Sequence, residues 1–293
     1  MAYINIGNMD EAYALLSVVE ACTPKYRSDV TFYKAYIDYA QKRYTQALPL
    51  FVSLEGDRKY GEEAGVYAAD IYLIQGEYDL ALRKASEYLR TNNNGSHALE
   101  MQRILGGAYY GKWQFDKAQT ALETYVNGTA NPERNALYQL GFCYFRAQAW
   151  MRAGETLGRV TVQCDALAQN AYLHMGLAFL KLSDKRQAQM AFEQASTMDF
   201  DKAVKEEALY NYALCIHETS YSPFAESVTV FERFLNEFPH STYSEKVNDY
   251  LIEVYMNTRS YEAALRSISK ISQPGPRILE AKQKILFRLG TQA

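Results

Sequence analysis

Thiols and imidazoles are the side chains of this chain best suited to metal binding or nucleophilic chemistry. The thiols belong to Cys22, Cys143, Cys164 and Cys215, and the imidazoles to His97, His174, His217 and His240. No two cysteines form the closely spaced pair that a zinc or redox site requires, and the histidines are scattered. The spacing therefore predicts no metal site and no cofactor, and we expect the cysteines to be small apolar residues of a core.

Acidic and hydroxyl side chains also lack a catalytic arrangement. Asp199 and Asp201 lie close together, but a solvated loop explains them. Asn94 and Asn127 begin glycosylation sequons, yet each falls at a predicted turn, where asparagine is common. No Gly-x-Ser-x-Gly, phosphate-binding glycine loop or His-Glu-x-x-His motif occurs. We therefore expect that the chain is not an enzyme.

The composition is that of a globular protein. The chain has 293 residues, of which 48% are hydrophobic and 22% charged, with a net charge of -3. An acidic balance argues against a nucleic-acid partner, which would favour a basic face. No apolar run approaches the ~20 residues that span a bilayer, so we expect no transmembrane segment. Apolar residues spaced three and four apart predict an all-α protein with short polar connections.

A small residue followed four positions later by a bulky one recurs every 34–39 residues. The small residues are Ala12, Ala47, Ala81, Ala118, Ala153, Ala188, Ser227 and Ala264. Glycine lies twelve positions before three of them, at Gly106, Gly141 and Gly176. We interpret each period as two helices, A with the glycine and B with the alanine, which cross closely because both residues are small. A large residue at Gly141 should overpack this crossing by about 1–3 kcal/mol.

This pattern resembles the tetratricopeptide-repeat (TPR) family. The match is best in LYQLGFCYFRAQAWMRAGETL (137–157) and YLHMGLAFLKLSDKRQAQMAFEQA (172–195). The resemblance implies an α-solenoid, a right-handed superhelix of tandem antiparallel helix pairs. The stretch FERFLNEFPHSTYSEKVNDYLIEVY (231–255) is also similar to repeats of bacterial cell-envelope TPR proteins. This similarity slightly favours a periplasmic or cell-envelope location of a soluble protein over a cytoplasmic one. It does not determine the compartment.

We predict one solenoid over residues 1–293. It comprises a half repeat at 1–25, full repeats at about 28–60, 62–94, 99–131, 134–166, 169–201, 206–240 and 245–273, and helix A of a ninth unit at 277–293. Both ends fall in mid-repeat, which indicates a fragment of a longer chain. An uncovered end helix would favour end-to-end self-association.

In the TPR family, helix A positions three before, one after and four after the glycine line the concave face. The resemblance therefore implies a candidate groove of Phe32, Tyr36, Tyr39, Tyr110, Tyr138, Phe142, Phe145, Leu173, Leu177 and Tyr210. Polar or small residues at equivalent positions are Asp70, Arg103 and Gly107. The alternative is that tight curvature buries these side chains between neighbouring A helices.

The leading functional hypothesis is a non-enzymatic scaffold that holds a helical or extended protein segment in this apolar groove. One alternative is a glycan-binding TPR protein of a sugar-uptake system, because the 25 tyrosines could stack on sugar rings. Another is the regulatory or interaction part of a larger protein whose catalytic domain lies elsewhere.

Overall fold

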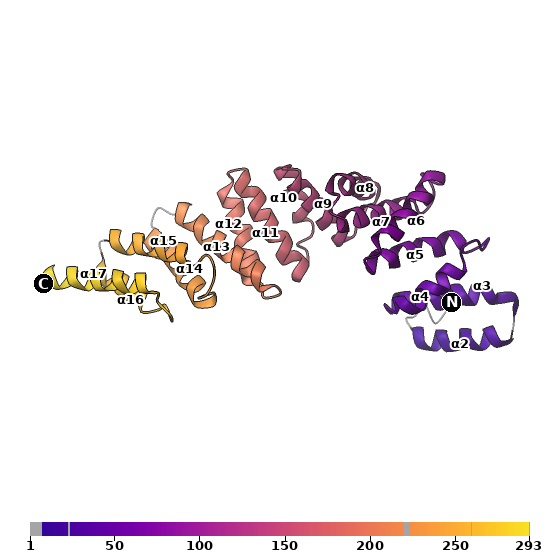
Figure 1. The fold of residues 1–293 in the computed structure, drawn as a ribbon, viewed down its shortest axis with the longest axis horizontal. Coiled ribbons are helices and arrows are strands. Elements are labelled where there is room, and N and C mark those ends of the chain that lie inside the picture. Colours follow the sequence, from indigo (N-terminus) through magenta and orange to yellow (C-terminus); the bar gives the residue numbers. More distant parts are fainter. Residues whose placement is uncertain (1–7, 23, 220–222, 259, 293) are drawn as a thin grey trace. The chain divides into compact units, whose positions relative to one another are not determined.

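The computed structural model describes residues 8–22, 24–219, 223–258 and 260–292. Every regular element in these ranges is a helix, which confirms the all-α prediction (Figure 1). Contacts divide the chain into two compact units, Met1–Cys143 and Tyr144–Ala293, here named unit 1 and unit 2. Residues 1–7 and 23 of the half repeat expected at 1–25 lie outside the described residues.

Unit 1 is a succession of short helices. They are α2 (Met9–Cys22), the 3₁₀ helix η1 (Pro24–Tyr26), α3 (Arg27–Ala40), α4 (Tyr44–Ser53), α5 (Gly61–Ile74), α6 (Tyr78–Thr91), α7 (Ala98–Gly111), α8 (Phe115–Gly128) and the first part of α9 (Arg134–Arg146).

Unit 2 continues the succession from the end of α9. Its helices are α10 (Trp150–Gly158), α11 (Ala166–Lys181), α12 (Lys185–Thr197), α13 (Lys202–Thr219), α14 (Pro223–Glu237), α15 (Ser244–Asn257), α16 (Tyr261–Ile268) and α17 (Pro276–Gln292).

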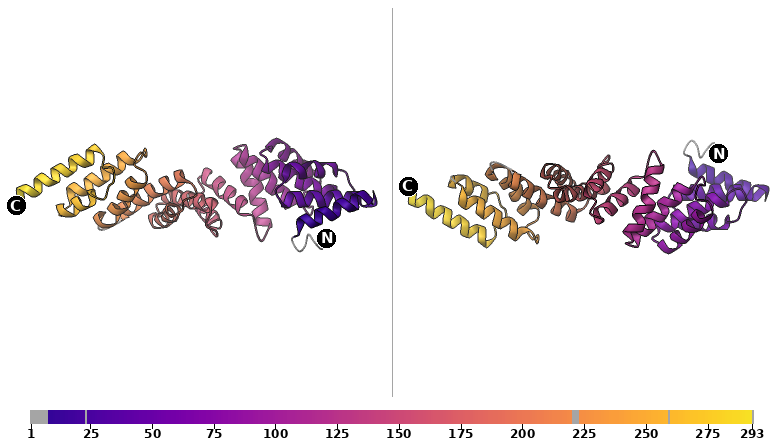
Figure 2. Two further views of the ribbon diagram at one scale, coloured as in Figure 1. Left: turned by 90° about the horizontal axis from the view of Figure 1, so that it is seen from below. Right: turned by 90° about the horizontal axis from the view of Figure 1, so that it is seen from above.

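Within each unit, helices that follow one another in the sequence lie side by side (Figure 2). Some helices also meet their next-but-one neighbour: α5 contacts both α6 and α7 in unit 1, and α11 contacts both α12 and α13 in unit 2. An A helix thus packs against its own B helix and against the A helix of the following repeat. This is the tandem arrangement of helix pairs that the sequence period predicts.

The turns between the two helices of a repeat share one backbone conformation. A residue five positions before the small helix B residue has φ between 60° and 79° at Lys42, Gly76, Trp113, Gln148 and Ser183. In the turn after α5, the amide of Glu77 donates to the carbonyl of Tyr72 (2.8 Å), and the amide of Gly76 donates to Leu73 (3.1 Å). This pair of hydrogen bonds is a Schellman motif, which ends helix A sharply and lets helix B turn back.

Glycines on the A helices permit close packing of the B helices. A Cβ on Gly106 would lie 2.6 Å from Cγ of Leu122, and one on Gly176 would lie 2.5 Å from Cε1 of Phe192. Leu122 and Phe192 come one turn after Ala118 and Ala188. The atoms nearest to each missing side chain therefore belong to the bulky residue of helix B rather than to its alanine.

The alanines that set the period are all buried. Ala81, Ala118, Ala153, Ala188 and Ala264 are fully inaccessible to solvent. Gly141 is buried as well. Burial at these positions agrees with their assignment to the faces where helices pack.

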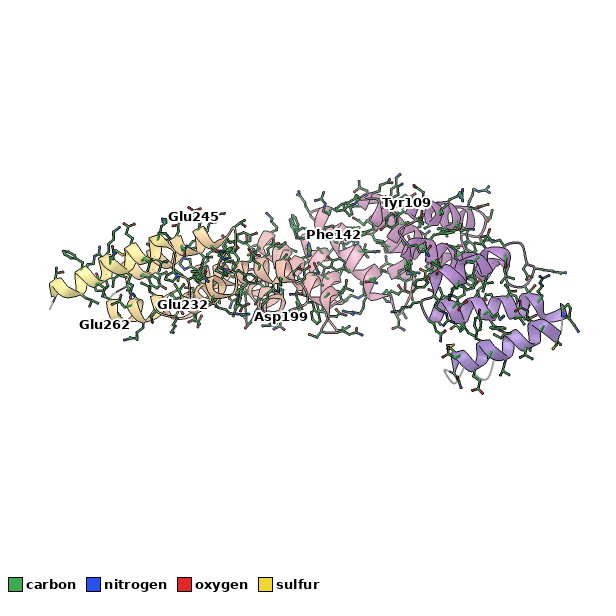
Figure 3. All side chains as sticks on the ribbon, turned by 60° about the horizontal axis from the view of Figure 1, so that its bottom comes forward. Tyr109, Phe142, Asp199, Glu232, Glu245 and Glu262 are labelled. Carbon is green, nitrogen blue, oxygen red and sulfur yellow. The ribbon has the colours of Figure 1, made fainter. Side chains whose placement is uncertain are left out.

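An acidic residue lies in the core of unit 2. Figure 3 labels Glu232, which lies on α14. This residue is only 5% exposed. It accepts a hydrogen bond from the hydroxyl of Ser267, which in turn lies 2.6 Å from the hydroxyl of Tyr255. Burial raises the pKa of this carboxyl above its ordinary value, although the Ser267 hydrogen bond partly opposes the shift.

Candidate functional site

Unit 1 contains a cavity of about 530 Å³ beside its A helices. Six of its lining residues occupy positions that the family resemblance assigns to the concave wall: Asp70, Leu73, Arg103, Gly107, Tyr110 and Phe142. They come from α5, α7 and α9, which are successive A helices. Residues about 35 positions apart in the sequence thus meet around one space, as a repeat of that length requires.

Two glycines of α7 line this cavity one helical turn apart. A Cβ on Gly107 would lie 3.0 Å from Cδ2 of Leu73, and one on Gly111 would lie 2.3 Å from the ring of Tyr78. Side chains at these positions would therefore meet Leu73 and Tyr78, both of which also line the cavity. The glycines let Leu73 and Tyr78 pack close to the α7 backbone.

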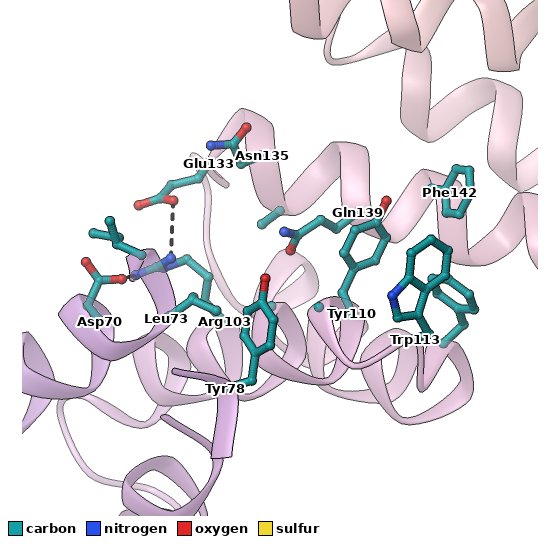
Figure 4. A pocket seen from close by; sticks show the side chains of 15 residues that line it. Asp70, Leu73, Tyr78, Arg103, Tyr110, Trp113, Glu133, Asn135, Gln139 and Phe142 are labelled. Atoms are coloured by element: carbon teal, nitrogen blue, oxygen red, sulfur yellow. Dashed lines mark hydrogen bonds and ion pairs between the residues drawn. The ribbon is translucent and has the colours of Figure 1, made fainter. Parts of the chain in front are cut away.

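Charged side chains gather at one end of the cavity (Figure 4). The guanidinium of Arg103 pairs with buried Asp70, with Glu100 at 2.5 Å, and with Oε2 of Glu133 at 3.5 Å. The hydroxyl of Tyr39 donates to the second oxygen of Asp70 at 2.5 Å. Asp70 therefore has a partner on each oxygen, whereas Glu133 has only the longest of the three contacts with Arg103.

The environment of this end shifts the pKa values of its members. Burial is the largest influence on Glu133 and raises the pKa of its carboxyl, although Arg103 opposes the shift. Burial, together with the neighbouring carboxylate of Asp70, raises the pKa of Tyr39. Tyr39 therefore stays protonated, as its role as hydrogen-bond donor to Asp70 requires.

Aromatic side chains gather at the other end (Figure 4). The ring of Tyr110 meets Phe142 edge-on at 5.9 Å and Phe115 at 5.6 Å, and Phe115 meets Trp113 at 5.8 Å. Burial raises the pKa of the Tyr110 hydroxyl. Edge-to-face contacts of this kind hold the rings in defined orientations.

Trp113 differs from the other rings in its exposure and in its backbone conformation. Its side chain is 77% exposed, and its backbone has φ of 61°, in the left-handed region that bulky residues rarely adopt. It occupies the turn position that carries glycine at Gly76. A large exposed aromatic ring therefore stands at a backbone position that favours glycine, beside the cavity.

The other candidate groove residues of unit 1 do not line the cavity. Phe32 is buried and stacks on Tyr60 at 4.4 Å, and Tyr36 packs edge-on against Tyr67 at 5.9 Å. Tyr138 stacks behind Phe142 at 6.4 Å, and burial raises the pKa of its hydroxyl to about 12. Tyr39 reaches the site only through Asp70.

In unit 2, two of the candidate groove residues are buried. Leu173 lies in a core cluster with Phe192, and Tyr210 stacks on Tyr243 at 4.2 Å. Phe145 lies against Trp150 and His174, and Leu177 packs at the edge of the same core as Leu173. Burial between helices, the alternative considered from the sequence, describes Leu173 and Tyr210, and binding at Phe145 and Leu177 stays a prediction.

Several lining residues were not among the residues assigned to the wall from the sequence: Tyr78, Trp113, Phe115, Glu133, Asn135 and Gln139. Tyr78 and Phe115 lie three positions before Ala81 and Ala118, so the repeat period is a signal that could have identified them. Glu133 precedes α9 in a connection between repeats, where periodicity carries no information.

The described residues contain no group of three or more side chains with metal-ligand chemistry. Cys143 and Cys215 are buried, as expected, and burial raises their thiol pKa values to about 12 and about 11. Cys22 and Cys164 are exposed, so the expectation that all four are core residues was wrong. The described helices also include none with the length and apolar character of a membrane span.

Comparisons with known proteins agree with the geometry. The sequence profile described as tetratricopeptide repeat matches residues 135–163. The C-terminal part of a TPR repeat-containing protein from Cytophaga hutchinsonii is 14% identical over 85% of this chain and 98% of its own, with a TM-score of 0.58. The apo form of the quorum sensor NprR from B. thuringiensis is 13% identical over 97% of this chain and 84% of its own, with a TM-score of 0.51. No curated protein sequence matches the chain. At these identities the structural likeness concerns the fold.

Proposed function

We propose that this chain, which contains a tetratricopeptide repeat and has the fold of such proteins, is a non-enzymatic scaffold that binds a protein segment in the cavity of unit 1. The fold in general supports a role in protein interaction. The observation that carries the proposal is the meeting of Asp70, Arg103, Tyr110 and Phe142 around one space.

The size and lining of the cavity support a peptide as the occupant. A volume of about 530 Å³ falls within the range of about 300–1,000 Å³ that is common for ligand pockets. It suits a few side chains of a segment that lies along the A helices. Aromatic rings such as Tyr110, Trp113 and Phe142 bury large areas at low entropic cost and are frequent anchors at protein interfaces.

A displayed library of random twelve-residue peptides tests the proposal without a known partner. We expect the wild-type protein to enrich a family of related peptides. A labelled peptide from that family is then titrated against Phe142→Ala and Tyr110→Ala. Each truncation should weaken binding about tenfold or more, because an aromatic anchor is lost.

The matched control is Glu155→Lys, an exposed position on α10. It should bind like the wild type. Circular dichroism of each variant separates a binding effect from unfolding. Unchanged affinity with retained helicity in both ring variants would exclude the cavity as the site, and loss of helicity would identify the rings as core. A library from which no peptide is enriched would refute the scaffold proposal itself.

A further inference from the structure

We propose that the segment bound in the cavity of unit 1 carries a lysine or arginine next to a large apolar residue, with the cation at Glu133 and the apolar side chain against Trp113 and Phe142. This inference rests on the proposed function and adds the chemistry of the partner. It follows from the unequal character of the two ends of the cavity (Figure 4).

The charged end has an excess of carboxylates. Asp70 and Glu133 line the cavity with Arg103, and Glu100 shares the same guanidinium. Three carboxylates thus surround one cation. An anionic segment, such as a free chain terminus or a phosphopeptide, would meet this excess negative charge, and a cationic side chain would offset it.

Among the three carboxylates, Glu133 is the one able to receive the incoming cation. Asp70 is nearly inaccessible and is held by Tyr39 and Arg103. The side chain of Glu133 is 54% exposed, and its contact with Arg103 is 3.5 Å, compared with 2.5 Å for Glu100. Partial burial raises the pKa of the Glu133 carboxyl, and a bound cation would favour its ionised form.

The aromatic end has the features of a receptor for an apolar side chain. Trp113 is the most exposed ring of the lining, and the edge-to-face contacts of Phe115 with Trp113 and Phe142 fix the orientation of the group. Gly107 lies one turn after Arg103 and one turn before Tyr110 on α7, beside Leu73, and neither residue adds charge. A single peptide that satisfies both ends therefore needs a basic and a large apolar residue close together.

Library selection on two forms of the protein tests this chemistry. Peptides enriched on the wild type should contain lysine or arginine near phenylalanine, leucine or tryptophan. On Glu133→Gln, the basic residue should lose its enrichment and the apolar residue should keep it. Glu155→Gln, which changes an exposed carboxylate on α10, should select the same peptides as the wild type.

A double-mutant cycle then measures the proposed pair directly. In the enriched peptide, replacement of the basic residue by glutamine should weaken binding to the wild type about fivefold, the size of a partly exposed ion pair. The same replacement should have little effect on binding to Glu133→Gln. Glu133→Lys should invert the preference and favour a glutamate in the peptide.

The fluorescence of Trp113 gives an independent readout. The chain has two tryptophans, Trp113 and Trp150, so a Trp150→Phe background isolates the signal of the cavity. Binding of a tryptophan-free peptide should shift this emission to shorter wavelength, because the exposed ring becomes covered. An unshifted emission spectrum at saturating peptide would overturn the proposal. Enriched peptides without a basic residue would also overturn it, as would a double-mutant cycle in which the glutamine replacement weakens binding equally to the wild type and to Glu133→Gln. In each of these three outcomes the protein still binds peptides. They would therefore contradict the proposed chemistry of the bound segment without contradicting the proposed scaffold function.

Discussion

The ring of Phe192 packs on the backbone of Gly176 so closely that a Cβ at this glycine would lie 2.5 Å from Cε1 of the ring. Gly176→Ala should therefore destabilise unit 2 by about 1–3 kcal/mol through overpacking, despite the better helix propensity of alanine. Chemical denaturation followed by circular dichroism measures the difference.

Gly65→Ala is the matched control for this substitution. Gly65 lies inside α5, and a Cβ there would meet no atom within 4 Å. Alanine should stabilise this helix by up to about 1 kcal/mol, since only the backbone entropy changes. If both alanine variants are stabilised equally, close packing is not what retains glycine at position 176.

The turn before α12 offers a stabilising substitution. Ser183 has φ of 60°, and the turn conformation is the same one that Gly76 adopts with φ of 79°. Ser183→Gly should raise stability by about 1 kcal/mol, because glycine enters the left-handed region without strain. Ser183→Ala keeps a Cβ and should bring no such gain. Equal stabilities of the two variants, determined from their denaturation midpoints, would mean that this backbone conformation is not strained.

The buried pair of Asp70 and Arg103 should respond unequally to removal of its two members. Their side chains are 7% and 11% exposed. Arg103→Met leaves the buried carboxylate with Tyr39 alone and should cost about 3 kcal/mol or more. Asp70→Asn should cost less, because Arg103 keeps Glu100 and Glu133. Urea denaturation of both variants ranks the effects, and a larger loss for Asp70→Asn would contradict the assigned network.

The buried carboxyl of Glu232 should make stability fall as pH rises. Its pKa in the folded protein is raised above the ordinary 4.5, so the unfolded chain loses the proton first. Stability is therefore highest below pH 4.5 as far as this group contributes, and it declines as pH rises through the folded pKa. Ionisation of a buried carboxyl is the physical cause.

Glu232→Gln keeps an oxygen for the hydroxyl of Ser267 and removes the ionisation. The variant should be at least as stable as the wild type at pH 7. The difference between their free energies of unfolding, measured from pH 4 to pH 8, should grow with pH. Parallel stability curves would show that Glu232 does not titrate in the core.

The sequence was enough to predict the helix pairs, because their cause is local and repetitive. A small residue at Ala118 or Ala188 and a bulky residue one turn later recur with a period that only stacked helix pairs explain. The same register identified Asp70, Arg103, Tyr110 and Phe142 as facing one side of their A helices. Periodicity determines the face of a helix, since side-chain direction follows the helical repeat.

Whether a residue on that face is open or buried was decided by the tertiary structure. Phe32 and Tyr110 both fall on predicted wall positions of their A helices, yet Tyr60 covers Phe32, whereas Tyr110 borders a cavity. The link from Asp70 through Arg103 to Glu133 likewise joins residues some 30 positions apart. The shape and the charge of such a cavity depend on side chains from several neighbouring repeats, whereas a sequence period describes only the positions within one repeat. The sequence therefore determined the helix pairs and the face of the A helix on which Asp70, Arg103, Tyr110 and Phe142 lie, and only the packing of neighbouring repeats decided where the cavity lies and that its two ends differ.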